Sequence, residues 1–148
     1  MKKRNLGRWS RRVLRALAVV VIPRGQGAPE VSMDELVDFM DDWVGYMPRL
    51  LRAVFPIGLM MLELGAFLLG PSLVPFSFMS EKRRARYIDG WVHARWSLRR
   101  DLIKGVKGLA LFGWYSDPAV AKYLGYQVEE HVQLVAAERL KRYGNELR

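Results

Sequence analysis

The stretch WYSDPAVAKYLGY, residues 114–126, determines how the end of the predicted fold is closed. Asp117 is suited to accept a backbone N–H at a helix start, and Pro118 suits the first helical position because it has no N–H to leave unpaired. Gly125 favours the left-handed conformation that ends a helix, which places Tyr126 to fold back onto the preceding turn. The stretch therefore predicts a structural motif, made by Trp114, Tyr115, Asp117, Pro118, Gly125 and Tyr126.

The composition indicates one folded domain with a basic surface. The chain has 148 residues, 51% of them hydrophobic, which is enough to bury a core. It has no cysteine, which excludes disulfides, thiolate metal sites and cysteine nucleophiles. The formal net charge of +9 predicts an anionic partner, which is an acidic protein surface, a phospholipid leaflet or a nucleic acid.

Charges of one sign are grouped along the chain. The amino terminus is basic as far as Arg15, and a purely acidic run follows, made by Glu30, Asp34, Glu35, Asp38, Asp41 and Asp42. Between Glu81 and Lys107 basic residues dominate again. Such runs either lie on solvated faces or meet an opposite charge. For the acidic run, the apolar spacing predicts an amphipathic helix with its acids outward.

Helical periodicity runs through nearly the whole chain and predicts an all-α fold. The fold class is a single helical domain of about five helices with a long central helix. Expected helices are 11–22, 32–47 (with a capping box at Ser32 and Glu35), 48–69 (kinked at Pro56), 80–115 (capped by Ser80) and 128–143. The chain divides into a basic N-terminal arm (1–10), a helical domain (11–126) and a C-terminal amphipathic helix (127–148).

The long helix expected at 80–115 has two contrasting faces when wound at about 100° per residue. The packed stripe comprises Tyr87, Trp91, Ala94, Leu98, Leu102, Gly105, Leu109 and Gly113. The opposite, cationic ridge comprises Lys82, Arg86, His93, Arg100, Lys104 and Lys107. This ridge is either a solvated face or a docking surface for an acidic protein, lipid headgroups or nucleic acid. Glycines 105, 108 and 113 suggest close approach by a neighbouring helix.

The segment Ala53–Met79 is the most apolar part of the chain and contains one charged residue, Glu63. Its length allows three interpretations: a buried core helix, a hairpin in the lipid headgroup region, or a membrane span. Pro56 and the pair Gly70-Pro71 favour the first two. As a core residue Glu63 would pair with an arginine, whereas in a span it would need a partner or a water path.

The amino terminus raises the question of export. Ser10-Arg11-Arg12-Val13-Leu14 resembles a twin-arginine signal, and an apolar run to Ile22 follows. The run is short for a signal core, and Pro23-Arg24 closes it. We therefore expect residues 11–22 to form the first helix of the domain, with export by the twin-arginine route as the alternative.

Residues suited to catalysis are few. His93 and His131 are the only histidines, and Asp89 lies four residues before His93. That pair could form a proton relay or half of a metal site. No third ligand or nucleophile follows at a spacing typical of metal sites or catalytic groups. The aspartates at 38, 41 and 42 lack the spacing of a calcium loop. We expect no catalytic residue, no metal and no enzyme activity.

Three segments carry a resemblance to a known family. Residues 14–25 (LRALAVVVIPRG) resemble the opening helix of the small helical subunits that accompany flavin-dependent dehydrogenases of the glucose–methanol–choline type, including the gluconate 2-dehydrogenase small subunit. A middle motif is similar to the module that precedes the flavin domain of long-chain alcohol oxidases; it comprises Phe76, Met79, Ser80, Glu81, Arg84, Tyr87, Ile88 and Trp91. Residues 115–126 resemble the motif that closes that module.

The resemblance implies a non-catalytic accessory subunit that binds and stabilises a separate FAD-dependent alcohol-oxidising enzyme. We expect the subunit to be cytoplasmic and peripheral to the inner membrane. FAD is implied in the partner alone, because Gly25-Gln26-Gly27 is followed by Glu30 where a dinucleotide fingerprint has its third glycine. The alternative is a membrane-associated structural subunit of a larger assembly. Nucleic-acid binding ranks third: Tyr87, Trp91 and Trp96 interleave with arginines, but two of them fall on the packed stripe.

Overall fold

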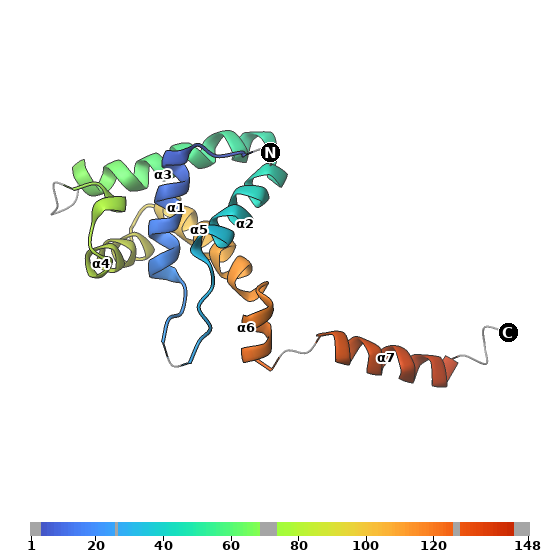
Figure 1. Ribbon diagram of the computed structural model, residues 1–148. Helices are drawn as coiled ribbons and strands as arrows, with labels where there is room; N and C mark the ends of the chain where they lie inside the picture. The colour runs from blue at the N-terminus through green and yellow to red at the C-terminus, as the bar shows by residue number, and fades with distance from the viewer. Residues whose placement is uncertain (1–3, 26, 69–73, 126–127, 144–148) are drawn as a thin grey trace.

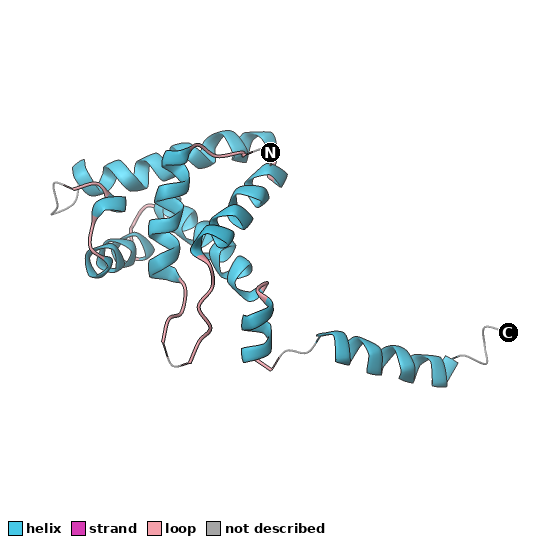
Figure 2. Ribbon diagram, viewed as in Figure 1, coloured by secondary structure: helices cyan, strands magenta, loops and turns pink. Residues whose placement is uncertain are grey.

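The computed structural model describes residues 4–25, 27–68, 74–125 and 128–143 (Figure 1). Every regular element in these ranges is a helix, which confirms the all-α class (Figure 2). The elements are α1 (Arg8–Val21), α2 (Met33–Tyr46), α3 (Arg49–Leu68), the short 3-10 helix η1 (Phe76–Phe78), α4 (Glu81–Val92), α5 (Ser97–Tyr115), α6 (Pro118–Tyr123) and α7 (Val128–Tyr143). In Figure 1, α7 lies apart from the bundle formed by the other helices.

The helix at the centre of the bundle is α1, drawn in blue in Figure 1. It begins three residues earlier than expected and ends just before Pro23. It contacts α2, α3, α4, α5 and η1, and it buries Val13, Leu14 and Leu17 completely. The basic arm is thus shorter than expected, because Arg8, Trp9 and Ser10 already belong to the helix.

The expected long central helix is wrong, because the chain turns between α4 and α5. The carbonyl groups of Ala94 and Arg95 accept hydrogen bonds from Nη1 of Arg100, at 2.6 and 3.1 Å. The guanidinium thus donates to carbonyl groups that, in an unbroken helix, would accept backbone N–H groups of the next turn. The turn allows α4 and α5 to pack against each other.

The break also alters which face of α5 is buried. The buried residues of α5 are Ile103, Val106, Ala110, Gly113 and Trp114, whereas Leu98, expected on the packed stripe, is 61% exposed. The packed stripe assumes one continuous helix, wound at about 100° per residue from Tyr87. Because the chain turns between α4 and α5, that rotation does not predict which residues of α5 are buried.

Of the three glycines expected at a close helix contact, only one makes it. A Cβ atom on Gly113 would lie 2.5 Å from Cδ1 of Leu36 and 2.8 Å from Cδ1 of Phe39, both on α2. The expectation is wrong for Gly105 and Gly108, where a Cβ atom would meet nothing within 4 Å. Only Gly113 therefore lets α5 approach α2 closely.

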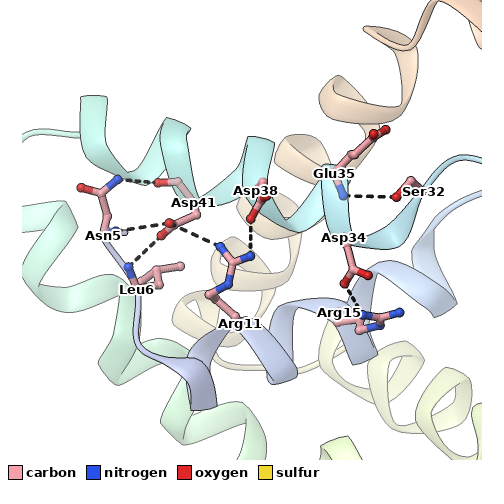
Figure 3. A network of polar contacts seen from close by, with 9 residues as sticks. All are labelled: Asn5, Leu6, Arg11, Arg15, Ser32, Asp34, Glu35, Asp38 and Asp41. Atoms are coloured by element: carbon pink, nitrogen blue, oxygen red, sulfur yellow. Dashed lines mark hydrogen bonds and ion pairs between the residues drawn. The ribbon is translucent and has the colours of Figure 1, made fainter. Parts of the chain in front are cut away.

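Opposite charges join α1 to α2 (Figure 3). Asp34, Asp38 and Asp41 share one face of α2, at helical spacing of four and three residues. Arg15 pairs with Asp34, and Arg11 pairs with Asp38 and with Asp41, whose Oδ2 lies 3.4 Å from its Nη1. The expectation that the acids of α2 face outward is therefore wrong for Asp41, which is buried, whereas the side chains of Asp34 and Asp38 stay 77% and 49% exposed while they pair with α1.

Asp41 is the buried member of this network and is 2% exposed. Its carboxylate accepts hydrogen bonds from the backbone N–H groups of Leu6 and Asn5, at 2.7 and 3.2 Å. The segment before α1 is thereby fixed to α2, with Leu6 in the core. One carboxylate of the acidic run is thus neutralised inside the fold, and those of Asp34 and Asp38 are paired nearer the surface.

Candidate interaction surfaces

The residues of the cationic ridge lie on two helices because of the break between α4 and α5. Lys82 and Arg86 are exposed on α4, and Lys104 and Lys107 are exposed on α5. The prediction of one ridge along one helix is wrong. What remains is two separate pairs of exposed cations, each pair spanning about one helical turn.

The other two ridge residues make contacts within the fold. The guanidinium of Arg100 is used by the carbonyl groups at the break, as described above, and the residue is half-buried. His93 is the C-cap of α4, and its Nδ1 lies 3.0 Å from the carbonyl oxygen of Asp89 and 3.4 Å from Oδ1 of the same residue. Neither side chain is positioned as a free cation for a partner.

The aromatic residues near the ridge mostly serve packing. Trp91 is buried, and Tyr87 is half-buried with its hydroxyl donating to the carbonyl oxygen of Leu62 at 3.1 Å. The guanidinium of Arg99 lies over the rings of Trp91 and Trp96, 5.3 and 5.2 Å from their centroids. Of the aromatic residues that suggested stacking on bases, only Trp96 is prominently exposed.

Burial raises the pKa of Tyr87 to about 12, and the nearby carboxylate of Glu63 adds to that rise. Hydrogen bonding with Trp91 and the charge of Arg99 act in the opposite direction. Because Tyr87 contacts α3 through its hydroxyl, the neutral form is the one that joins α4 to α3.

Glu63 is buried on α3, but its partner differs from the one expected. It is 2% exposed, and its carboxylate accepts hydrogen bonds from the backbone N–H and the hydroxyl of Ser77, at 2.8 and 2.5 Å. The expected pairing with an arginine is therefore wrong. The short helix η1 is folded against α3, which lets Ser77 satisfy the carboxylate with neutral donors.

The middle motif of the family resemblance holds the bundle together. Phe76, Met79, Ile88 and Trp91 are all buried in the core. Arg84 donates from Nε to the carbonyl oxygen of Met79 at 2.9 Å, and its terminal nitrogens lie 3.4 Å from carbonyl oxygens of Ser77 and Ala16. This one side chain therefore links α4 to η1 and α1.

The closing motif has the geometry that its sequence predicts. Oδ1 of Asp117 accepts the backbone N–H of Ala119 at 2.8 Å, and Pro118 occupies the first turn of α6. Gly125 has a φ of +70°, in the left-handed region. Trp114 is buried and its ring lies 5.0 Å from that of Tyr115, while Tyr126 falls outside the described residues.

The most unusual surface is the outer face of α3. This helix of 20 residues is long and apolar enough, by length and composition, to cross a membrane. One side of it, with Leu59, Leu62 and Ala66, is buried. The side chains of its outer face are between 42% and 74% exposed: Leu50, Leu51, Val54, Ile57, Met60, Met61, Leu64, Phe67 and Leu68.

The sequence left the role of Ala53–Met79 open because both faces of α3 are apolar. The two faces of α3 are distinguished by the positions of its glycines. A Cβ atom on Gly58 would lie 2.7 Å from Cδ1 of Leu102, and one on Gly65 would lie 2.9 Å from the hydroxyl oxygen of Tyr87. Glycines at these positions mark the face that packs on α4 and α5.

Within the described part of the chain, no group of three or more histidine, aspartate or glutamate side chains is arranged to hold a metal ion. Asp89 and His93, the one pair that suggested chemistry, lie on an exposed helix end. Comparison of the chain with protein-family models, curated proteins and solved structures finds no match. The surfaces described above are therefore the basis for assigning a function.

Proposed function

We propose that this chain is a non-catalytic helical accessory subunit that binds and stabilises a separate FAD-dependent alcohol-oxidising enzyme of the glucose–methanol–choline type. In this proposal the complex lies on the cytoplasmic surface of the inner membrane. The observation that carries the proposal is the closing motif, whose resemblance to the accessory module is the most specific in the chain. Its carboxylate and its glycine both serve the fold: Asp117 caps α6, and Gly125 ends it.

The way these residues are used fits a binding subunit. Val120, within the closing motif, is fully buried, and Asp117 already accepts a hydrogen bond from Ala119. In the middle motif, Arg84 is occupied by backbone carbonyl groups. Both motifs support the shape of the bundle, as expected for a subunit whose task is to present a surface.

The exposed cations on α4 and α5 are the proposed contact with the enzyme. Lys104 and Lys107 lie one turn apart on α5, and Lys82 and Arg86 lie about one turn apart on α4. Such groups attract an acidic protein surface and orient it on approach. Arg100 is left out of this contact, because removing its guanidinium would leave the carbonyls at the helix break unpaired.

The test is to search the neighbouring reading frames for a glycine-rich flavin fingerprint and to co-express the chain with the flavoprotein found in this way. We expect the two chains to co-purify with FAD, in a complex that salt weakens. The double variant Lys104→Glu/Lys107→Glu should abolish co-purification without changing the helical circular-dichroism signal. The matched control, Lys122→Glu/Lys141→Glu, reverses two exposed lysines elsewhere and should leave the complex intact.

Two results would refute the proposal. One is a purified chain that retains a flavin absorption band by itself after extensive dialysis. The other is failure of any flavoprotein to co-purify from native membranes. The alternative, a membrane-associated structural subunit of another assembly, is favoured by the outer face of α3, and it would be supported if other proteins co-purified stoichiometrically without FAD.

A further inference from the structure

The outer face of α3 stays exposed in the bundle, although it carries nine large apolar side chains. From Ala53 to Leu68 the only ionisable side chain is that of Glu63, and it points into the fold, where Ser77 binds it. The outer face is therefore built entirely from aliphatic, methionine and phenylalanine side chains. A helix of this length presents them over about 30 Å.

We propose that the outer face of α3 inserts into the headgroup region of an anionic lipid bilayer, with the helix parallel to the membrane. This inference deepens the proposed function, since it names the surface that places the subunit at the membrane. In this position the apolar side chains reach about 5–10 Å into the boundary between headgroups and acyl chains. The rest of the bundle stays on the aqueous side.

The inner face of α3 explains why the helix lies along the membrane and does not cross it. Leu59 and Leu62 are fully buried in the bundle, and Tyr87 donates a hydrogen bond to the carbonyl oxygen of Leu62. Glu63 is held by both hydrogen bonds from Ser77. A spanning helix would have to give up these contacts and expose a carboxylate to hydrocarbon, which is costly.

Lipid fits this face better than a protein partner does. Protein interfaces carry about one hydrogen bond per 100–200 Å², together with a polar rim. Beyond Arg52, the exposed side chains of α3 offer no donor or acceptor, so they can exclude water but cannot specify a partner. A bilayer requires no such specificity.

Charge at the beginning of α3 favours an anionic bilayer. Arg49 and Arg52 lie exposed in its first turn, and Tyr46, just before it, is 82% exposed. Basic residues at this depth attract acidic headgroups, and aromatic side chains are enriched there. Nη2 of Arg52 also donates to the carbonyl oxygens of Gly45 and Met47, at 2.5 and 3.1 Å, which fixes this group relative to the end of α2.

The absence of cysteine makes the proposal directly testable, because one introduced cysteine is the only thiol. Met61→Cys on the outer face of α3 and Leu98→Cys on α5 are each labelled with an environment-sensitive fluorophore. Both positions are exposed, at 43% and 61%. With vesicles of phosphatidylcholine and phosphatidylglycerol, we expect a blue shift and quenching by headgroup-level nitroxide lipids at Met61, and no change at Leu98.

Sedimentation with the same vesicles gives the energetic test. The variant Ile57→Ser/Met61→Ser/Leu64→Ser should lower the partition coefficient on the order of a hundredfold, because three apolar side chains lose their burial. The control variant Leu98→Ser/Leu134→Ser/Leu140→Ser removes three exposed leucines away from α3 and should leave partitioning unchanged. Arg49→Gln should weaken partitioning about fivefold, which corresponds to ~1 kcal/mol for one basic residue at the surface.

Several results would overturn this inference. An unchanged fluorophore at Met61 with vesicles would do so, as would a shift that appears without lipid when the chain dimerises or meets the flavoprotein. Stronger quenching by nitroxides at the bilayer centre, with protease protection, would indicate a span. The proposed function is tested separately. If only the membrane contact is lost, the variant Ile57→Ser/Met61→Ser/Leu64→Ser should still co-purify with the flavoprotein in detergent.

Discussion

The guanidinium of Arg11 lies 3.4 Å from the carboxylate of Asp41, and both side chains are largely removed from solvent. The pair joins the first turn of α1 to the middle of α2. Because Asp41 also accepts the N–H groups of Asn5 and Leu6, one carboxylate fixes three parts of the chain.

This arrangement predicts that Asp41→Ala lowers the free energy of unfolding by about 3–5 kcal/mol, since Nη1 of the largely buried Arg11 and the N–H groups of Asn5 and Leu6 all lose their carboxylate, while Asp38 still pairs with Arg11. Chemical denaturation measures the loss. Asp34→Ala is the matched control, because Asp34 pairs with Arg15 at an exposed position. It should cost no more than about 1 kcal/mol. Equal losses for the two variants would contradict the role assigned to Asp41.

Glycines on the two sides of α5 should respond in opposite directions to alanine. Gly108→Ala should raise the free energy of unfolding by about 1 kcal/mol, because its Cβ meets open space and alanine favours the helix. Gly113→Ala should destabilise by about 1–3 kcal/mol, because its Cβ would crowd Leu36 and Phe39. Thermal or chemical unfolding tests both, and a stabilising Gly113→Ala would mean that α2 and α5 are farther apart.

The raised pKa of Tyr87 predicts a loss of stability at high pH. Its usual pKa is 10.0, and in the fold it is about 12. The folded state therefore favours the neutral phenol, so this contribution to stability is complete below about pH 10 and is lost as the pH rises to about 12. Tyr87→Phe should remove this part of the decline.

Spectrophotometric titration of tyrosinate provides an independent measurement of the same group. The wild-type chain should show an ionisation near pH 12 that is missing from Tyr87→Phe. A difference between the two titration curves centred near pH 10 would instead show that Tyr87 is more hydrated than its contact with Leu62 indicates.

The closing motif should act on stability and assembly together. Asp117→Ala should cost about 1 kcal/mol through the lost cap, and Gly125→Val about 1–2 kcal/mol because its φ is positive. Melting temperature and co-purification with the flavoprotein should fall in parallel. Lys122→Ala, an exposed change in the same helix, is the control. If Asp117→Ala instead abolished turnover of the complex at full stability, Asp117 would have to reach the reaction centre.

Local signals in the sequence predicted most of the helices. Ser32, Asp117 and Gly125 act where expected, because caps and left-handed glycines depend on few neighbouring residues. The break between α4 and α5 could not be predicted in this way. It depends on Arg100 reaching back to the carbonyls of Ala94 and Arg95, and residues 80–115 keep helical periodicity throughout.

Contacts between distant segments were the least predictable. The acidic face of α2 looked like a solvated surface because its counter-charges, Arg11 and Arg15, lie about twenty to thirty residues earlier, and their pairing depends on how α1 packs. The apolar length of α3 was evident from composition. Which side of it would be covered depended on Gly58 and Gly65, whose neighbours lie on later helices.

The position of α1 at the centre of the bundle affects how the chain is made. Its partners extend from α2 to α5, so the ribosome releases the first helix long before the last of its neighbours exists. Until residues as far as Tyr115 have emerged, α1 and the inner side of α3 cannot be completely buried, and the outer side of α3 is exposed throughout. Contacts of such sequence separation slow folding. The nascent chain would thus offer its most lipophilic helix to a membrane or a chaperone before the domain has closed.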